Sequence, residues 1–322
     1  MALYTVSRLL SPLIKATRLI SHGNVAGLLE VHVLPTIIKP IGICSVKGVS
    51  EMKVVKPDFI VAGGMRCATG WIRQCLRDHP NIYMPQREPH YFNRNYEKGV
   101  DWYLELFSSY EGEKLAGEKT ASYFHYRDSP FRMIDMNPDV KVIVCLRDPV
   151  ERMFSHYSMH AQTDETLRNQ GFLESINSGS DFVNWSRYAE QVENFKDHIP
   201  EKNLRFVIYE DKDIDPTLFI QDLYTFLGVN PLYKSPSAEL RTKLGQFEHN
   251  HWFWRTLSTI MLHPRAPLFF RQLYTEIRPS SSASAIDEEI YKELSIYFDD
   301  LPLLEELLGR KLDWRTRKYV TA

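Results

Sequence analysis

Two stretches of the chain combine arginine and hydroxyl side chains in a pattern that suits an anionic ligand. In the first, Arg66 and Thr69 lie among small residues that follow an apolar segment. In the second, Arg147 also follows an apolar segment, and Ser155 comes about two helical turns later. Backbone N–H groups of a tight loop and of a helix N-terminus attract an anion, and a guanidinium can bind a phosphate through two parallel hydrogen bonds. The two stretches therefore predict a binding site for a phosphate-bearing ligand.

Two pairs of acidic and basic side chains indicate proton-transfer chemistry. Glu88 and His90 lie two residues apart beside a proline, and Glu118 directly precedes Lys119. A carboxylate or an imidazole can take a proton from a substrate hydroxyl. We prefer Glu88 as the base, because an ion pair with Lys119 would lower the pKa of Glu118 and make it a poorer base. A surface salt-bridged loop and a structural ion pair are the alternative interpretations of these two pairs.

Apolar runs rich in β-branched residues predict the strands that position these side chains. The predicted strands cover Phe59–Ala62, Asn81–Met84, Val140–Leu146 and Leu204–Tyr209. Predicted helices alternate with them, from Trp71 onward and at Asp101–Phe107, Tyr188–Ile199, Leu218–Leu227 and Ile286–Leu308. Two polar segments, Thr163–Asp181 and Ser235–Gln246, are predicted to be irregular. The alternation predicts a three-layer α/β fold with a mostly parallel central sheet, in which ligands bind at the carboxyl ends of the strands.

The helix that follows the third predicted strand has a strong N-terminal signal. Asp148 is a favourable N-cap, Pro149 suits the first turn, and Glu151 completes a capping box. Arg147 is therefore expected between a strand end and a helix N-terminus, where a phosphate could reach it. In the alternative interpretation, Arg147 pairs with a nearby acid and has only a structural role.

The composition limits the class of protein. The chain has 322 residues, 43% of them hydrophobic, which is ample for a large core. A net charge of -2 argues against a broad nucleic-acid-binding surface, and four scattered cysteines without a CxxC motif fit a reduced, cytosolic protein. No Gly-Lys-Ser/Thr follows the glycines of the first loop, which disfavours an ordinary nucleoside triphosphatase. His249 and His251 lack a third ligand at metal spacing, so no metal site is predicted.

Residues 1–56 differ in character from the rest of the chain. Five basic residues face a single acid before Glu51, and leucines and isoleucines at helical spacing suggest an amphipathic helix. No stretch is long and apolar enough to span a membrane, and none fits a signal peptide. We therefore predict a helical arm over 1–56 and one domain over 57–322. The arm either packs on the domain or makes a peripheral contact with a membrane or a partner.

Residues 57–315 together resemble the sulfotransferases that use 3'-phosphoadenosine 5'-phosphosulfate (PAPS). The run Gly64–Trp71 is similar to the 5'-phosphosulfate loop of that family, with Arg66 in the place of the usual lysine. The run Leu146–Tyr157 is similar to the 3'-phosphate motif. Glu88–Phe92 resembles a stretch of the heparan sulfate 3-O-sulfotransferases, in which the glutamate is the proposed base and the histidine assists it.

The resemblance implies a role for each of these residues. The donor PAPS and its product PAP would be bound by Arg66, Cys67, Ala68, Thr69, Gly70, Trp71, Arg147, Ser155, Tyr188, Arg241, Lys243 and Gly245. Within that set, Trp71 and Tyr188 would contact adenine. The catalytic set would be Glu88, His90, Lys119, Arg66 and Glu118. The catalytic histidine of cytosolic members is replaced by Ala121, which excludes a histidine base at that position.

These residues predict an enzyme that passes the sulfuryl group of PAPS to a hydroxyl or amine of a small-molecule or natural-product acceptor. A carbohydrate sulfotransferase is the alternative, and a nucleotide-binding, kinase-like protein is another. The late cysteine pair and the N-terminal anchor of Golgi glycan enzymes have no counterpart here, which predicts a cytoplasmic enzyme of bacterial type. Residues 160–187 and 246–275 are expected to line or cover the acceptor site.

Overall fold

The computed structural model describes residues 55–112, 115–176, 180–245 and 286–320, with side chains up to residue 240 in the third range. They belong to one compact unit, Met52–Ala322. The helical arm predicted for 1–56 falls almost entirely outside these ranges, as does the aromatic-rich stretch at 246–275. Among the described residues, no helix has the length and apolar character needed to cross a bilayer.

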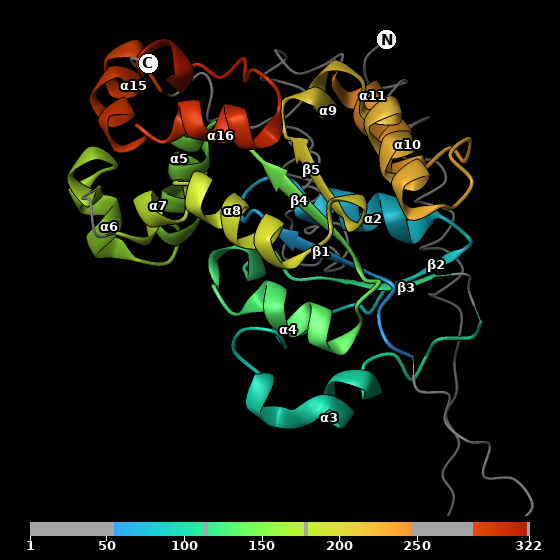
Figure 1. The fold of residues 1–322 in the computed structure, drawn as a ribbon. Helices are drawn as coiled ribbons and strands as arrows, with labels where there is room; N and C mark the ends of the chain where they lie inside the picture. Colours follow the sequence, from blue (N-terminus) through green and yellow to red (C-terminus); the bar gives the residue numbers. More distant parts are fainter. Residues whose placement is uncertain (1–54, 113–114, 177–179, 246–285, 321–322) are drawn as a thin grey trace, which may run out of the picture. The chain divides into compact units, whose positions relative to one another are not determined.

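Five parallel strands form the central sheet (Figure 1). They are β1 (Phe59–Gly63), β2 (Ile82–Tyr83), β3 (Leu115–Lys119), β4 (Lys141–Leu146) and β5 (Leu204–Ile208). Their order is β2-β3-β1-β4-β5, so the chain passes from β1 to the edge strand β2, returns to place β3 beside β1, and then crosses to build β4 and β5 on the other side. The connections that follow β1 and β4 therefore diverge to opposite sides. In open α/β sheets this switch point opens a crevice that ligands occupy.

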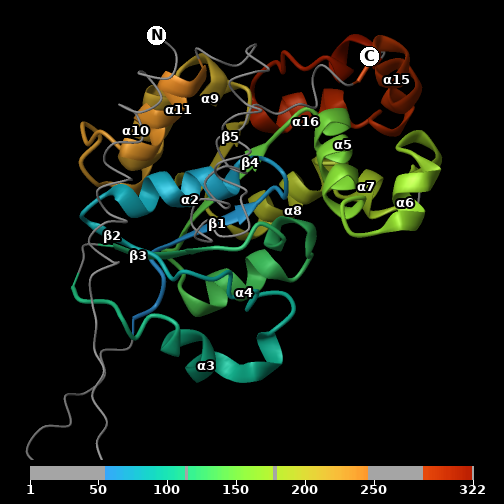
Figure 2. The ribbon, with the colours of Figure 1, turned by 180° about the vertical axis from the view of Figure 1, so that it is seen from behind.

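Helices cover both faces of the sheet, as the two opposite views show (Figures 1 and 2). The first half of the chain contributes α2 (Thr69–Asp78), α3 (Gly99–Glu105), α4 (Ser129–Met136), α5 (Pro149–His160) and α6 (Glu165–Gln170). The second half contributes α7 (Asp181–Asn184), α8 (Ala189–His198), α9 (Asp211–Ile214), α10 (Pro216–Leu227), α11 (Pro236–Gly245), α15 (Glu288–Leu294) and α16 (Leu301–Leu308). α2, α10 and α11 pack together on one face, whereas α4, α8 and α16 pack on the other. The predicted three-layer α/β architecture is confirmed.

The sequence of β1 reflects its position between these layers. All residues of Phe59–Gly63 are buried. Phe59 and Val61 pack in the core under α2 and α10, whereas Ile60 and Ala62 pack in the core under α4, α8 and α16. Successive side chains of a strand point to opposite faces, so a strand covered on both faces has to be apolar throughout.

Two segments predicted to be irregular contain helices instead. Within Thr163–Asp181 the chain forms α6, whose N-cap Asp164 accepts a hydrogen bond from the Leu167 N–H at 3.1 Å. Within Ser235–Gln246 it forms α11, where the Ser235 hydroxyl accepts from the Ala238 N–H at 3.2 Å. Both helices begin at ordinary cap residues but lack a clear apolar stripe, and the prediction relied on that stripe.

Candidate active site

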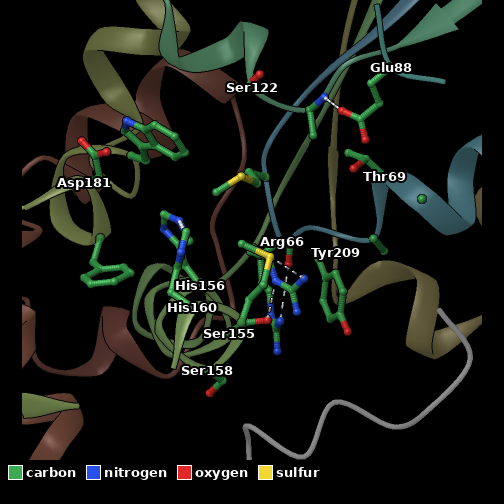
Figure 3. Close-up of a pocket in the computed structure, with 18 of the residues that line it drawn as sticks. Arg66, Thr69, Glu88, Ser122, Ser155, His156, Ser158, His160, Asp181 and Tyr209 are labelled. Carbon is green, nitrogen blue, oxygen red and sulfur yellow. Dashed lines mark hydrogen bonds between the residues drawn. The ribbon is translucent and has the colours of Figure 1, made fainter. Parts of the chain in front are cut away.

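The carboxyl ends of the strands meet around a cavity of about 900 Å³ (Figure 3). The loop after β1, the end of β3, the second half of α5 and the short helix α7 all contribute to its wall. Of the residues that the sequence singled out, the cavity is lined by Arg66, Ala68, Thr69, Gly70, Trp71, Glu88, His90, Lys119, Arg147 and Ser155. The fold thus brings both predicted anion-binding motifs to one place, together with Glu88, His90 and Lys119 of the two predicted proton-transfer pairs.

The loop after β1 joins the two anion-binding motifs directly. Arg66 and Ala68 adopt left-handed backbone conformations, with φ of 70° and 58°, and Cys67 between them is fully buried. The guanidinium Nε of Arg66 donates to the hydroxyl of Ser155 at 3.0 Å. No side chain caps the N-terminus of α2 in the described structure. Uncapped N–H groups beside an arginine and a serine make a concave site for an anion.

Arg147 lies deep in this site and is held from two sides. Its Nη2 donates to Glu151 Oε2 at 2.7 Å, and its guanidinium lies 4.3 Å from the centroid of the Tyr209 ring. The other oxygen of Glu151 accepts from the hydroxyl of Tyr291, in α15, at 3.2 Å. Arg147 thus pairs with an acid, Glu151, as the purely structural interpretation of this residue expected. It nevertheless lines the cavity. The pair leaves the guanidinium oriented toward the cavity rather than withdrawn from it.

The predicted capping box at the start of α5 is wrong in one respect. Asp148 does cap the helix, because it accepts from the N–H groups of Val150 and Glu151 at 3.0 and 3.3 Å. The backbone N–H of Asp148, however, donates to Glu210 at 3.1 Å, so the Glu151 side chain is free of that role and pairs with Arg147. Glu210, two residues after β5, therefore accepts the hydrogen bond that a capping box would assign to Glu151.

Glu88 and Lys119 form the proton-transfer wall of the cavity. Lys119 Nζ donates to Glu88 Oε1 at 2.5 Å, and the Ala121 N–H donates to Oε2 at 3.3 Å. Burial favours a raised pKa for Glu88, but the ammonium and these hydrogen bonds outweigh burial and hold the pKa below its usual value. His90 Nε2 lies 3.9 Å from Glu88, and its Nδ1 contacts the Ser122 hydroxyl at 3.2 Å. Burial lowers the pKa of His90 in spite of the neighbouring carboxylate.

Glu118 does not share this wall, which corrects the predicted ion pair with Lys119. Adjacent residues of a strand point to opposite faces, so Glu118 is fully buried in the core. It accepts hydrogen bonds from the hydroxyls of Thr120 at 2.9 Å and Tyr103 at 3.3 Å. Burial raises its pKa to about 8, against the lowered value expected from the sequence. Glu118 therefore has no access to an acceptor in the cavity.

Of the two residues expected beside adenine, Trp71 lines the cavity and Tyr188 does not. Trp71 lines the cavity at its edge, with its ring packed near Phe219. Tyr188 is fully buried, does not line the cavity, and donates its hydroxyl to the Arg147 carbonyl at 3.1 Å. Tyr209 lines it instead. The sequence offered a signal for Tyr209, because it is the last residue of the predicted strand Leu204–Tyr209.

The late cofactor loop expected at Arg241, Lys243 and Gly245 forms the end of α11. The side chains of these three residues lie outside the described structure. No group of three or more histidine, cysteine or acidic side chains in the described ranges is arranged to hold a metal ion.

The wall opposite Glu88 and Lys119 comes from α5, α6 and α7 (Figure 3). It includes His156 and His160 of α5, Phe182 of α7, and Trp185 directly after α7. The sequence placed residues 160–187 near the acceptor, and several of them do line the cavity. His160 is the first residue of that range, whereas His156, four residues earlier on the same face of α5, was not predicted as a site residue.

Comparisons with known proteins agree with this arrangement. The family model described as "Sulfotransferase domain" matches residues 56–249. Heparan sulfate glucosamine 3-O-sulfotransferase 3B1 of Homo sapiens is 32% identical over 180 residues, which cover 54% of this chain and 46% of that protein. Bifunctional heparan sulfate N-deacetylase/N-sulfotransferase 3 of Homo sapiens is 28% identical over 219 residues, covering 62% and 24%. The chain thus spans about half the length, or less, of these curated relatives.

A solved structure supports the same fold. The sulfotransferase from Alicyclobacillus acidocaldarius superposes with a TM-score of 0.57 and 23% identity, covering 80% of this chain and 98% of that one. The family match extends over more than half of the chain and includes both anion-binding motifs and both carboxylates discussed above. The chain belongs to the sulfotransferase domain family.

Proposed function

We propose that this protein transfers the sulfuryl group of PAPS to a hydroxyl group of an acceptor and releases PAP. The observation that carries the proposal is the single cavity that joins the Arg66–Ser155–Arg147 cluster to the Glu88–Lys119 pair. The first group suits the phosphates of a donor, and the second suits the proton and charge movements of the transfer. Membership of the sulfotransferase family supports the same reaction.

The donor fits the charges and hydroxyls of the site. The uncapped start of α2, Thr69 and Arg66 would hold the 5'-phosphosulfate, and Arg147 with Ser155 would hold the 3'-phosphate. Tyr209 is placed at the cavity wall near Arg147, where it would meet the adenosine. A dianionic phosphate would compete with Glu151 for Arg147, and the guanidinium has enough donors for both.

The transfer is a direct displacement at sulfur. The acceptor oxygen forms a bond to sulfur while the bond from sulfur to the bridging phosphate oxygen breaks, and the acceptor proton passes to a base. Lys119 and Arg66 would stabilise the negative charge that develops on the bridging oxygen. Arg66 keeps its proton under all conditions, so Lys119 is the better donor if the leaving group takes one.

Glu88 is the base that this geometry supports. It lines the cavity as a carboxylate, whereas Glu118 is buried on the other face of β3 with a pKa of about 8. In the structure, Lys119 Nζ donates a hydrogen bond to Glu88 Oε1. If Lys119 turns to the donor, Glu88 loses the neighbour that holds its pKa down and becomes a stronger base. His90 is near enough to orient the acceptor or share the proton.

Two classes of acceptor are compatible with this site. Relatives at about 32% identity are named as heparan sulfate enzymes, which supports a carbohydrate as the alternative to a small molecule. The 900 Å³ cavity can contain a donor and a small acceptor together.

Ligand-induced stabilisation and labelled transfer test the proposed reaction. PAP should raise the melting temperature, and ATP with Mg²⁺ should not, because the site lacks a Walker A lysine. With labelled PAPS, an acceptor screen should yield a sulfated product. Stabilisation by ATP with Mg²⁺ but not by PAP would reject the sulfotransferase assignment in favour of a kinase-like protein.

The base can be tested with a matched pair of variants. Glu88→Gln should lower kcat by about 10²–10⁴-fold with PAP affinity nearly unchanged, whereas Glu118→Gln should keep turnover. The reverse result would assign the base to Glu118. Equal and small effects would point to His90 or to an amine acceptor.

A further inference from the structure

A buried arginine starts a chain of hydrogen bonds that ends at the cavity wall. Arg152 is fully buried, and in the described structure it forms no ion pair with a carboxylate. Its Nε donates to the Ser186 hydroxyl at 2.5 Å and its Nη2 to the Phe182 carbonyl at 2.7 Å. Its two terminal nitrogens also lie 3.5 and 3.4 Å from His156 Nδ1. Arg152 therefore ties α7 to α5 and also acts on an imidazole of the cavity.

These contacts fix the tautomers of two histidines. A guanidinium can only donate, so His156 Nδ1 accepts from Arg152 and the ring proton is on Nε2. His156 Nε2 lies 3.1 Å from His160 Nε2, so His156 donates and His160 accepts. With Nε2 accepting, Nδ1 is the nitrogen of His160 that can donate. The donor-to-acceptor direction of these hydrogen bonds is thus set by the Arg152 guanidinium, which always keeps its protons.

The same network holds an aromatic wall in place. The Trp185 ring makes stacked contacts with His156, at 5.3 Å and 15°, and with His125, at 4.6 Å and 8°. Phe182 meets His156 edge-on at 4.8 Å and 77°. Trp185, Phe182 and both α5 histidines line the cavity. His156 and His160 lie across it from Glu88 (Figure 3). Flat apolar surfaces of this kind bind rings by stacking and edge contacts.

The charge of this wall disfavours a polyanion. His156 stays neutral, since burial and the adjacent Arg152 lower its pKa to about 2. Among the described cavity residues from α5 to α7, the one acidic or basic side chain other than histidine is Asp181. Asp181 and Trp185 also border a second cavity of about 650 Å³, which is lined as well by Arg127, Asp128, Glu190, Glu193, Asp197, His125 and His198. A sulfated chain leaving the site on this side would meet mostly carboxylates.

We propose that the wall of α5 and α7 is the acceptor subsite, and that it takes an uncharged acceptor whose ring packs on Phe182 and Trp185 while a polar group accepts a hydrogen bond from His160 Nδ1. The inference rests on the proposed sulfuryl transfer and adds the class of acceptor. His160 sets specificity and orientation, and Glu88 on the opposite wall takes the proton.

Acceptor competition between two probes tests the class. With labelled PAPS, 7-hydroxycoumarin represents an uncharged ring-bearing acceptor with a carbonyl, and a sulfated heparan-type tetrasaccharide represents the polyanion. We expect transfer to 7-hydroxycoumarin and little to the tetrasaccharide. Transfer to the tetrasaccharide alone, or to neither probe by a protein that binds PAP, overturns the acceptor class and leaves the donor assignment intact. Failure to bind PAP rejects the proposed function itself.

Variants of His160 test the hydrogen bond. His160→Phe keeps a ring but removes the donor, so KM for 7-hydroxycoumarin should rise about tenfold and by more than kcat changes. His160→Asn places an amide N–H near the position of Nδ1 and should recover most of that loss. His198→Phe, on α8 and exposed, is the matched control and should leave KM unchanged. A KM that stays at the wild-type value in His160→Phe, or that His160→Asn does not improve, contradicts the role of His160.

Discussion

Glu118→Gln should make the protein more stable at neutral pH while leaving the active site working. The Glu118 carboxyl is fully buried and accepts from the hydroxyls of Thr120 and Tyr103. A glutamine of nearly the same shape can serve both hydroxyls through its amide. The substitution therefore removes an ionisable group from the core without leaving a cavity.

The expected gain in the free energy of unfolding follows from the pKa of Glu118. Its ordinary value is 4.5, and burial raises it to about 8 in the folded protein. Between these values the folded state keeps a proton that the unfolded state releases, so this group makes stability fall as pH rises through that window. At about 1.36 kcal/mol per pH unit, the loss between pH 4.5 and pH 7.5 is on the order of 4 kcal/mol. Above pH 8 the loss reaches its limit.

Urea unfolding of both proteins at pH 5 and pH 8 measures this difference. The wild type and Glu118→Gln should have similar free energies of unfolding at pH 5, and the variant should be more stable by several kcal/mol at pH 8. Glu210, whose pKa burial raises to about 7, acts in the same direction but is present in both proteins.

Glu88→Gln is the control of opposite sign. The folded protein holds the pKa of Glu88 below its ordinary value, so its contribution to stability is present above pH 4.5 and is lost as pH falls through the lower, folded value. This variant should lose stability at neutral pH. A difference between wild type and Glu118→Gln that does not change with pH would mean that Glu118 is ionised in the fold, and the reasoning would be refuted.

Three further predictions concern the donor site, metal ions and the start of α5. Arg147→Ala should weaken PAP binding in calorimetry by about 1.5–3 kcal/mol, because a phosphate loses a charge-assisted partner, and unchanged affinity in a folded variant would contradict the 3'-phosphate assignment. Turnover should persist in EDTA, since Arg66, Lys119 and backbone donors supply the positive charge, and activity lost in EDTA and restored by Mg²⁺ or Zn²⁺ would revive a metal-dependent mechanism. Asp148→Ala should lower stability in urea by about 2–4 kcal/mol, because it removes a helix cap and orphans the buried Thr316 N–H and hydroxyl, which Asp148 accepts at 2.9 and 2.7 Å. Asp164→Ala, an exposed cap on α6, should cost about 1 kcal/mol at most, and equal losses in the two variants would contradict the role of burial.

The sequence predicted the parts of the site that depend on local pattern. The apolar runs identified β1 and β4, and the rule that ligands bind at strand ends placed Arg66 and Arg147 together. Asp148 and Pro149 marked the start of α5 within one residue. These features follow from short-range chemistry, and a single sequence contains that information.

Partners from distant segments were not predictable in this way. Glu210 and Thr316 both hydrogen-bond Asp148, and only the folded chain brings them to α5. The displaced Glu151 then reaches Arg147, which the local capping motif did not indicate. The error at Glu118 has another cause, because none of the predicted strands includes Glu118 and Lys119. Once β3 extends to Lys119, the alternation of a strand separates the two side chains.

The placement of Lys119 implies an order of events on the proposed pathway. Its ammonium holds the pKa of the Glu88 carboxylate below its usual value, which makes Glu88 a weak base. Lys119 is also the cation nearest to that base on the same wall, so the donor's bridging oxygen and Glu88 compete for it. Donor binding therefore strengthens Glu88 as a base at the moment when an electrophilic sulfur is present. An acceptor bound alone meets an unreactive pair, and the acceptor is activated only in the ternary complex.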